Sequence, residues 1–168
     1  MDNSPKNVPY TRFAKIQIKQ LEELENGDAK VKGYASTFGN RDLYDDIMEK
    51  GCFKKTLETS KGKWPVLYQH SEAVGINNKA AEDEKGLYVE STIFSSKIEK
   101  AREMVALVKA YAKAGFNMGL SIGGLIKNYD FLKIDKIWTT VIKEFQVLEH
   151  SLTPVSYTHL TLPTIYSV

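Results

Sequence analysis

The stretch that decides the fold is LYVESTIFSSKIEKAREMVALVKAYAKAG, which runs from Leu87 to Gly115. In its first eight residues, Leu87, Val89, Ser91 and Ile93 share one face, which is the period of a strand. Ser96 and Glu99 then have the spacing of a capping box, which predicts a helix start, and Gly115 predicts a left-handed helix stop. Between them, one apolar stripe recurs every three or four residues: Ile98, Ala101, Val105, Val108 and Ala112.

Most of the remaining chain reads as strands. Turns are predicted at Asn26-Gly27 and Lys85-Gly86. Strand-like runs cover residues 13–19, 29–38, 64–70, 120–126 and 137–152, and a short helix is expected over 53–57. Because parallel β-α-β alternation is missing, we expect an α+β, mainly β fold: an antiparallel β-barrel or strongly curved sheet with one long helix and short helices.

Composition excludes several classes of protein. The chain has 168 residues, of which 42% are apolar and 26% charged, so one globular domain is expected. A net charge of +2 argues against an obligate nucleic-acid binder, and Cys52, the single cysteine, forms no internal disulfide or thiolate cluster. Without a membrane-length apolar run or a signal-peptide core, the sequence predicts a soluble intracellular domain that binds neither nucleic acid nor membrane.

Ser121 is the first candidate for chemistry, because GLSIGG over residues 119–124 contains a G-x-S-x-G pattern. A hydrolase elbow needs a strand before the serine and a helix after it, whereas a strand-like LIKNY follows here. Close packing of a glycine-rich strand is the simpler interpretation. If Ser121 is a nucleophile, the backbone amides of Gly123 and Gly124 are candidate oxyanion donors, since glycine permits close approach.

His70 is the candidate base, because a neutral imidazole can accept a serine proton near pH 7. A half-buried structural histidine is the alternative. Glu149 and His150 are adjacent in one predicted strand, so they face opposite sides and only one can face a site. The acidic segment Asn40–Asp46 lacks metal-ligand spacing and reads as a solvated turn or part of substrate entry. No metal or cofactor is expected.

The order of these motifs resembles the prohead maturation proteases of tailed bacteriophages, which are related to the herpesvirus assemblins. The resemblance covers Val31 to Pro154. It rests on these segments: GYASTFGNRDLYDDIMEKGCF, VLYQH, GLYVE, a helix, GLSIGG and VLEHSLTP. It implies an assemblin-like fold with His70 as general base and Ser121 as nucleophile. Glu149 matches the suspected third member, and His150 is its rival because the assemblins use a second histidine.

The function implied by the resemblance is a serine endopeptidase that processes scaffold and major capsid proteins during prohead maturation. It would act in the host bacterial cytoplasm, inside the assembling prohead, and form a homodimer by analogy with the assemblins. The alternative is a non-catalytic capsid-assembly or scaffold-binding module with the same fold. A lipase or esterase is disfavoured, because too little chain follows Ser121 for that topology.

The expected boundaries follow from where the resemblance weakens. Residues 1–12 are expected to be a flexible N-terminal arm and residues 13–155 a prohead protease domain truncated at its C-terminus. Residues 156–168, SYTHLTLPTIYSV, resemble translated sequencing-adaptor read-through and are expected to be a non-native tail.

The third triad member is predicted from charge. A carboxylate stabilises a developing imidazolium better than a neutral imidazole does, so Glu149 is expected to lie nearer His70 than His150 does.

Overall fold

The computed structural model describes residues 8–42, 44–116 and 118–153. Eight strands and two helices follow one another along these residues: β1 (Val8–Glu23), β2 (Ala29–Thr37), β3 (Asp46–Met48), α1 (Lys54–Ser60), β4 (Trp64–Tyr68), β5 (Glu72–Glu82), β6 (Gly86–Ile93), α2 (Glu99–Lys113), β7 (Gly119–Ile134) and β8 (Ile137–Thr153). The mainly β prediction is confirmed, and α2 is the long helix.

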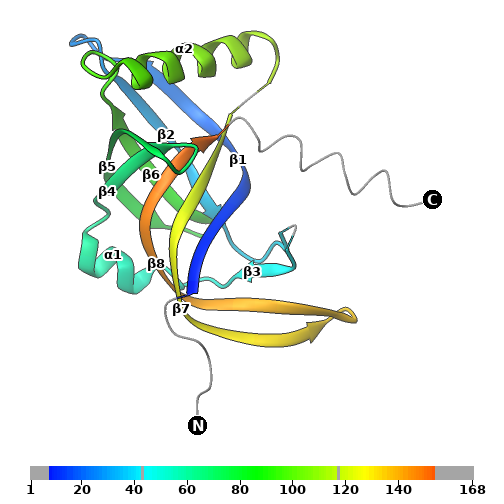
Figure 1. The fold of residues 1–168 in the computed structure, drawn as a ribbon. Helices are drawn as coiled ribbons and strands as arrows, with labels where there is room; N and C mark the ends of the chain where they lie inside the picture. The colour runs from blue at the N-terminus through cyan, green and yellow to red at the C-terminus, as the bar shows by residue number, and fades with distance from the viewer. Residues whose placement is uncertain (1–7, 43, 117, 154–168) are drawn as a thin grey trace.

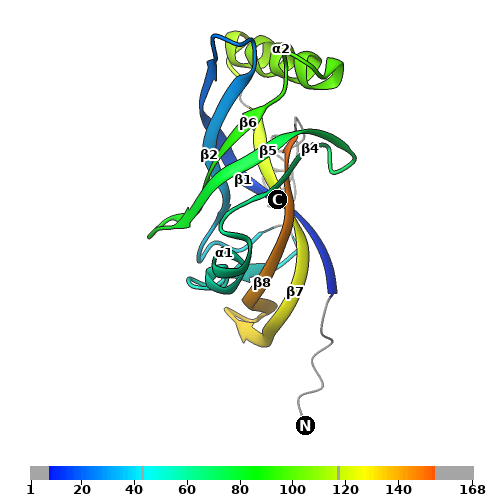
Figure 2. The ribbon, with the colours of Figure 1, turned by 90° about the vertical axis from the view of Figure 1, so that its left-hand side faces the viewer.

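All eight strands belong to one strongly curled sheet (Figure 1). From β8 the pairings run through β4, β5, β6, β2, β1 and β7, and β7 pairs again with β8. The strand β3 attaches to β8 at Thr140–Ile142, and β4 attaches to β8 at His150–Leu152. The two helices lie near opposite ends of this sheet (Figure 2).

The antiparallel prediction is wrong at β8, which runs parallel to both β3 and β4. The direction of β8 is fixed by its hairpin with β7, with which it pairs from Gly119↔Thr153 to Ile134↔Ile137. After β8 has returned along β7, its other edge pairs with β3 and β4, and both of these strands run in the same direction as β8. This parallel pairing brings the end of β4 beside the end of β8.

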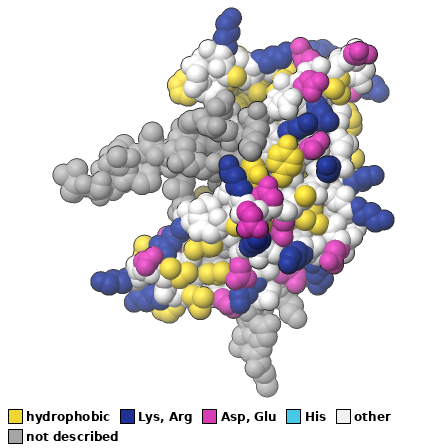
Figure 3. All heavy atoms as spheres, turned by 180° about the vertical axis from the view of Figure 1, so that it is seen from behind, with side chains coloured by type: hydrophobic (Ala, Val, Ile, Leu, Met, Phe, Trp, Pro, Cys, Tyr) yellow, Lys and Arg dark blue, Asp and Glu magenta, His cyan; other side chains and the backbone are white. Residues whose placement is uncertain are grey.

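The β7–β8 hairpin is longer than the alternating pattern predicted. Its two turn residues, Asp135 and Lys136, have φ of 50° and 68°, the left-handed pair that a tight hairpin turn requires. The outer part of the hairpin projects from the body (Figure 1), and hydrophobic side chains gather on it when the molecule is seen from behind (Figure 3). Phe131 and Trp138 stack there with ring centroids 5.0 Å apart.

The start of α2 differs from the predicted capping box. Its N-cap is Ile98, which makes no side-chain cap, and the Ser96 hydroxyl donates instead to Asp28 Oδ1 in the β1–β2 turn at 2.5 Å. The predicted stop is confirmed: Gly115 has φ of 84°, and the Phe116 amide donates to the Tyr111 carbonyl at 2.8 Å.

The apolar stripe of α2 faces the sheet for most of its length. Ala101, Met104, Val105 and Val108 are buried, whereas Ala112 at the far end is exposed. At the other end of the sheet, Phe53 before α1 packs edge-on against Phe145 of β8 with centroids 5.9 Å apart. Among the described residues, no helix is long and apolar enough to cross a membrane.

The expected N-terminal arm is partly a strand. Residues 8–12 belong to β1 and pair with β7, from Val8↔Ile126 to Arg12↔Ile122. The edge of β7 that does not face β8 thereby has a paired strand along these residues. Residues 1–7 of the arm and the expected tail over 156–168 lie outside the described residues.

Candidate active site

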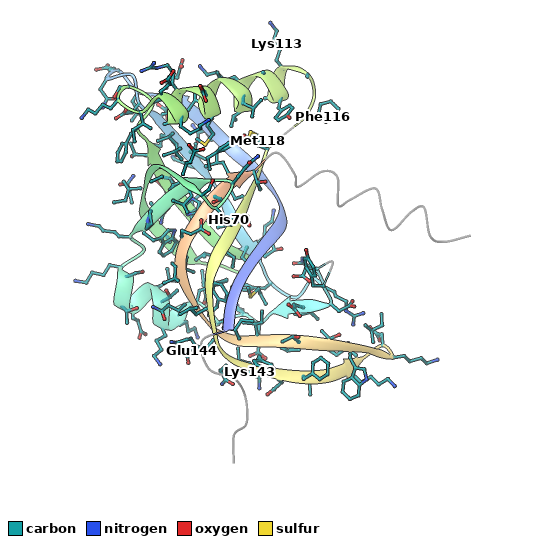
Figure 4. All side chains as sticks on the ribbon, viewed as in Figure 1. His70, Lys113, Phe116, Met118, Lys143 and Glu144 are labelled. Atoms are coloured by element: carbon teal, nitrogen blue, oxygen red, sulfur yellow. The ribbon has the colours of Figure 1, made fainter. Side chains whose placement is uncertain are left out.

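Three of the predicted site residues meet in a hydrogen-bonded chain. His70 Nε2 lies 2.8 Å from Ser121 Oγ, and His70 Nδ1 lies 2.5 Å from Glu149 Oε1. The imidazole therefore bridges the hydroxyl and the carboxylate, although 51 residues separate the histidine from the serine. Figure 4 shows His70 over the strands that carry its two partners.

The backbone around His70 is held in an uncommon conformation. Gln69 and His70 follow β4 with φ of 49° and 58°, left-handed values that cost a non-glycine residue roughly 1–2 kcal/mol each. Hydrogen bonds fix this turn: the His70 amide donates to Ser151 Oγ at 2.9 Å, and the Ser71 amide donates to the Tyr68 carbonyl at 3.1 Å. Strained backbone of this kind is typical of functional sites, where surrounding contacts over-determine it.

Sheet register brings the other two groups to the same place. Ser121 on β7 is directly opposite Ser151 on β8, and Gly123 is directly opposite Glu149. Ser121 is fully buried, whereas the side chains of His70 and Glu149 remain 17% and 13% exposed. Solvent therefore reaches this group of side chains at His70 and Glu149, and not at Ser121.

Gly123 and Gly124 have a packing role in this arrangement. A Cβ at Gly123 would lie 1.9 Å from Glu149 Oε1, and one at Gly124 would lie 2.0 Å from the Gln146 carbonyl oxygen. Both glycines are also paired on either side, with β1 and with β8, so their backbone amides face the neighbouring strands. Glycine at position 123 thus makes room for the carboxylate, and the expected oxyanion role of the pair stays a prediction.

His150 belongs to a different, fully buried network. Its Nδ1 accepts a hydrogen bond from Trp64 Nε1 at 2.8 Å, and its Nε2 lies 3.1 Å from Ser91 Oγ, which donates to Asn77 Oδ1. Burial lowers the pKa of His150 to about 3, so the ring is neutral. The alternation of β8 therefore turns Glu149 towards His70 and His150 into the core.

We expect the neutral state of His150 to make the protein acid-sensitive. Below the ordinary histidine pKa of 6.5, His150 binds a proton in the unfolded chain, whereas in the folded chain it stays neutral down to about pH 3. From this group alone, the free energy of unfolding should fall by up to about 1.4 kcal/mol per pH unit in that window. Chemical denaturation at a series of pH values should show a flatter dependence for His150→Gln than for the wild type. Parallel losses in the two proteins would contradict this.

The acidic loop after β2 forms local contacts. Asp42 Oδ1 accepts hydrogen bonds from the amides of Tyr44 and Asp46 at 2.8 Å and 3.0 Å, and Asp45 Oδ1 lies 4.0 Å from Arg41 Nε. Within the described ranges, no group of three His, Cys, Asp or Glu side chains is arranged to hold a metal ion. These carboxylates therefore organise the turn between β2 and β3.

The sequence interpretation assigned no role to one contact residue of the site. Ser151 Oγ donates to Glu149 Oε2 at 2.9 Å and accepts from the His70 amide. The Glu-x-Ser spacing could have indicated it, because residues two apart in a strand share a face.

The arrangement can support one kind of chemistry. The Ser121 hydroxyl is placed so that its proton can pass to His70 Nε2, and the Glu149 carboxylate orients the other ring nitrogen, as the activation of a serine nucleophile requires. Burial raises the pKa of the Cys52 thiol, so this single cysteine is not a competing nucleophile.

Comparisons with known proteins identify the family. The sequence pattern of the family described as "Caudovirus prohead serine protease" matches residues 14–160. The "Prohead protease" of Enterobacteria phage HK97 is 33% identical over 130 residues, which cover 76% of this chain and 55% of that protein. The chain thus spans about half the length of this curated relative.

A solved structure shares the fold. The capsid assembly protease of bacteriophage T4 superimposes with a TM-score of 0.55 at 13% identity, covering 86% of this chain and 99% of the T4 chain. At that identity the similarity concerns the fold alone. The extent of the family match decides the affiliation: the chain belongs to the caudovirus prohead serine protease family.

Proposed function

We propose that this protein is a serine endopeptidase that cleaves capsid and scaffold proteins during maturation of a phage prohead. The observation that carries the proposal is the continuous chain from Ser121 Oγ through His70 to Glu149 in a member of this family. The names of its relatives, a prohead protease and a capsid assembly protease, support the substrate class.

The proposed reaction follows from the roles of the three side chains. Ser121 Oγ attacks the carbonyl carbon of the scissile peptide while His70 Nε2 takes the hydroxyl proton. The imidazolium then returns this proton to the leaving amine as the C–N bond breaks, which leaves an acyl-enzyme. A water molecule, deprotonated by the same imidazole, hydrolyses the ester and restores Ser121. Glu149 accepts the Nδ1 hydrogen bond throughout and stabilises the imidazolium.

Further details of the proposal follow from the family. We infer an assemblin-like barrel, supported by pairings that run around the sheet and return to β8. A protease domain over residues 13–155 is supported by the family match over 14–160. The expected place of action is the assembling prohead in the host cytoplasm, with self-association as in the assemblins. Neither nucleic acid nor membrane is a proposed partner.

The test uses the scaffold and capsid proteins of the same phage as substrates. The purified chain should convert them to discrete shorter products, identified by mass spectrometry. Pretreatment with a fluorophosphonate, which esterifies an activated serine, should abolish the cleavage and add one phosphonyl group at Ser121. Intact substrates under assembly-like conditions would contradict the proposal and favour the non-catalytic assembly module.

A further inference from the structure

Ser151 joins two members of the triad through a single hydroxyl. The residue is fully buried on β8, where it is directly opposite Ser121 of β7 and pairs with Leu67 of β4. Its oxygen accepts the hydrogen bond of the His70 amide at 2.9 Å, and its proton goes to Glu149 Oε2, also at 2.9 Å.

We propose that Ser151 is a positioning residue that fixes the His70 turn and the Glu149 carboxylate relative to each other. This inference rests on the proposed peptidase function, since it concerns the activation of Ser121. A backbone amide can only donate, so the Ser151 oxygen must accept from His70, and its own proton remains available for the carboxylate.

The two contacts act on different degrees of freedom. Glu149 Oε1 is bound by His70 Nδ1 and Oε2 by Ser151, so rotation of the carboxylate is restricted at both oxygens. The amide contact holds His70 in its left-handed backbone conformation, from which the ring reaches Ser121. Loss of the hydroxyl would release both constraints and remove this acceptor from the His70 amide.

The chain supplies a matched control in Ser91. Ser91 is also fully buried in a strand and also makes two side-chain hydrogen bonds, but its partners are Asn77 and His150. Ser91→Ala removes an equivalent buried hydroxyl without touching the triad. It therefore separates loss of stability from loss of positioning.

The readout is the rate at which a fluorophosphonate labels Ser121, which needs no knowledge of the cleavage site. Ser121 Oγ forms a bond to phosphorus, the P–F bond breaks, fluoride leaves, and His70 accepts the hydroxyl proton. For folded protein we expect Ser151→Ala to lower the second-order labelling rate constant about 10- to 100-fold, the range for a hydrogen bond to a charged group. Ser151→Thr should recover most of the rate, and Ser91→Ala should keep the wild-type value.

The labelling rate of the folded fraction distinguishes positioning from simple destabilisation. Without the Ser151 hydroxyl, the His70 turn and the Glu149 carboxylate are no longer held relative to each other, so the rate constant of folded protein should fall. A partly unfolded population would lower the amount of labelled protein without changing the rate constant of the folded fraction. Should Ser151→Ala fail to fold, Ser151→Cys keeps the volume with a weaker donor, and the same direction of change is expected.

A wild-type labelling rate constant in folded Ser151→Ala or Ser151→Cys would overturn the positioning role while leaving the peptidase intact. A wild-type chain that neither reacts at Ser121 nor cleaves capsid proteins would overturn the proposed function, and this inference with it.

Discussion

Ser121→Ala is expected to lower the rate of capsid-protein cleavage by about 10⁶-fold, the loss seen when the nucleophile of a serine triad is removed. The substitution deletes only Oγ, which lies 2.8 Å from His70 Nε2, and alanine fits the space that serine leaves. Because this variant lacks the hydroxyl that would form the acyl-enzyme, binding alone should provide the residual rate. Initial rates at equal concentrations of folded protein, checked by circular dichroism, measure the effect.

Two further variants make this result specific. Ser36→Ala removes another buried serine hydroxyl from β2 and should cleave at the wild-type rate. His70→Ala should lose nearly as much activity as Ser121→Ala, and the double variant little more, because the two groups act as a unit. Cleavage that persists in Ser121→Ala would show that the products arise from another enzyme or another site.

The sequence predicted those features that depend on local pattern. The strand period placed Glu149 and His150 on opposite faces, and the structure has Glu149 beside His70 and His150 in the core. Gly115 ended the helix as its permissive backbone predicts. Local periodicity and turn chemistry operate over a few residues, so they can be read without knowing the fold.

The features that were missed depend on contacts between distant segments. The parallel alignment of β4 with β8 follows from how the hairpin returns, which no local pattern records. Ser96 has the spacing of a helix cap, but its hydroxyl donates a hydrogen bond to the Asp28 carboxylate in another turn. Ser151 acquires its role only because the His70 turn lies against β8. For both serines, a partner from a distant segment decides what the hydroxyl does.

Glu149→Gln is expected to lower cleavage by about 10⁴-fold, as replacing the carboxylate of a serine triad by its amide does. If the amide NH₂ faces His70, it donates to Nδ1, and the ring then carries its proton on Nε2, where it cannot accept from Ser121. If the amide oxygen faces His70, the NH₂ meets Ser151 Oγ, which needs an acceptor there. Both orientations lose a contact, and neither supplies the charge that stabilises the imidazolium.

His150 provides the discriminating control for Glu149. His150→Gln alters the adjacent residue of β8, whose ring contacts Trp64 and Ser91 instead of His70. It should reduce stability while folded protein retains its specific activity, so the ratio of activity to folded fraction separates the two variants. The assignment of Glu149 would fail if folded Glu149→Gln kept wild-type kcat and His150→Gln lost it. That outcome would require the β8 register to turn the imidazole outward, which would leave the Trp64 indole without its buried acceptor.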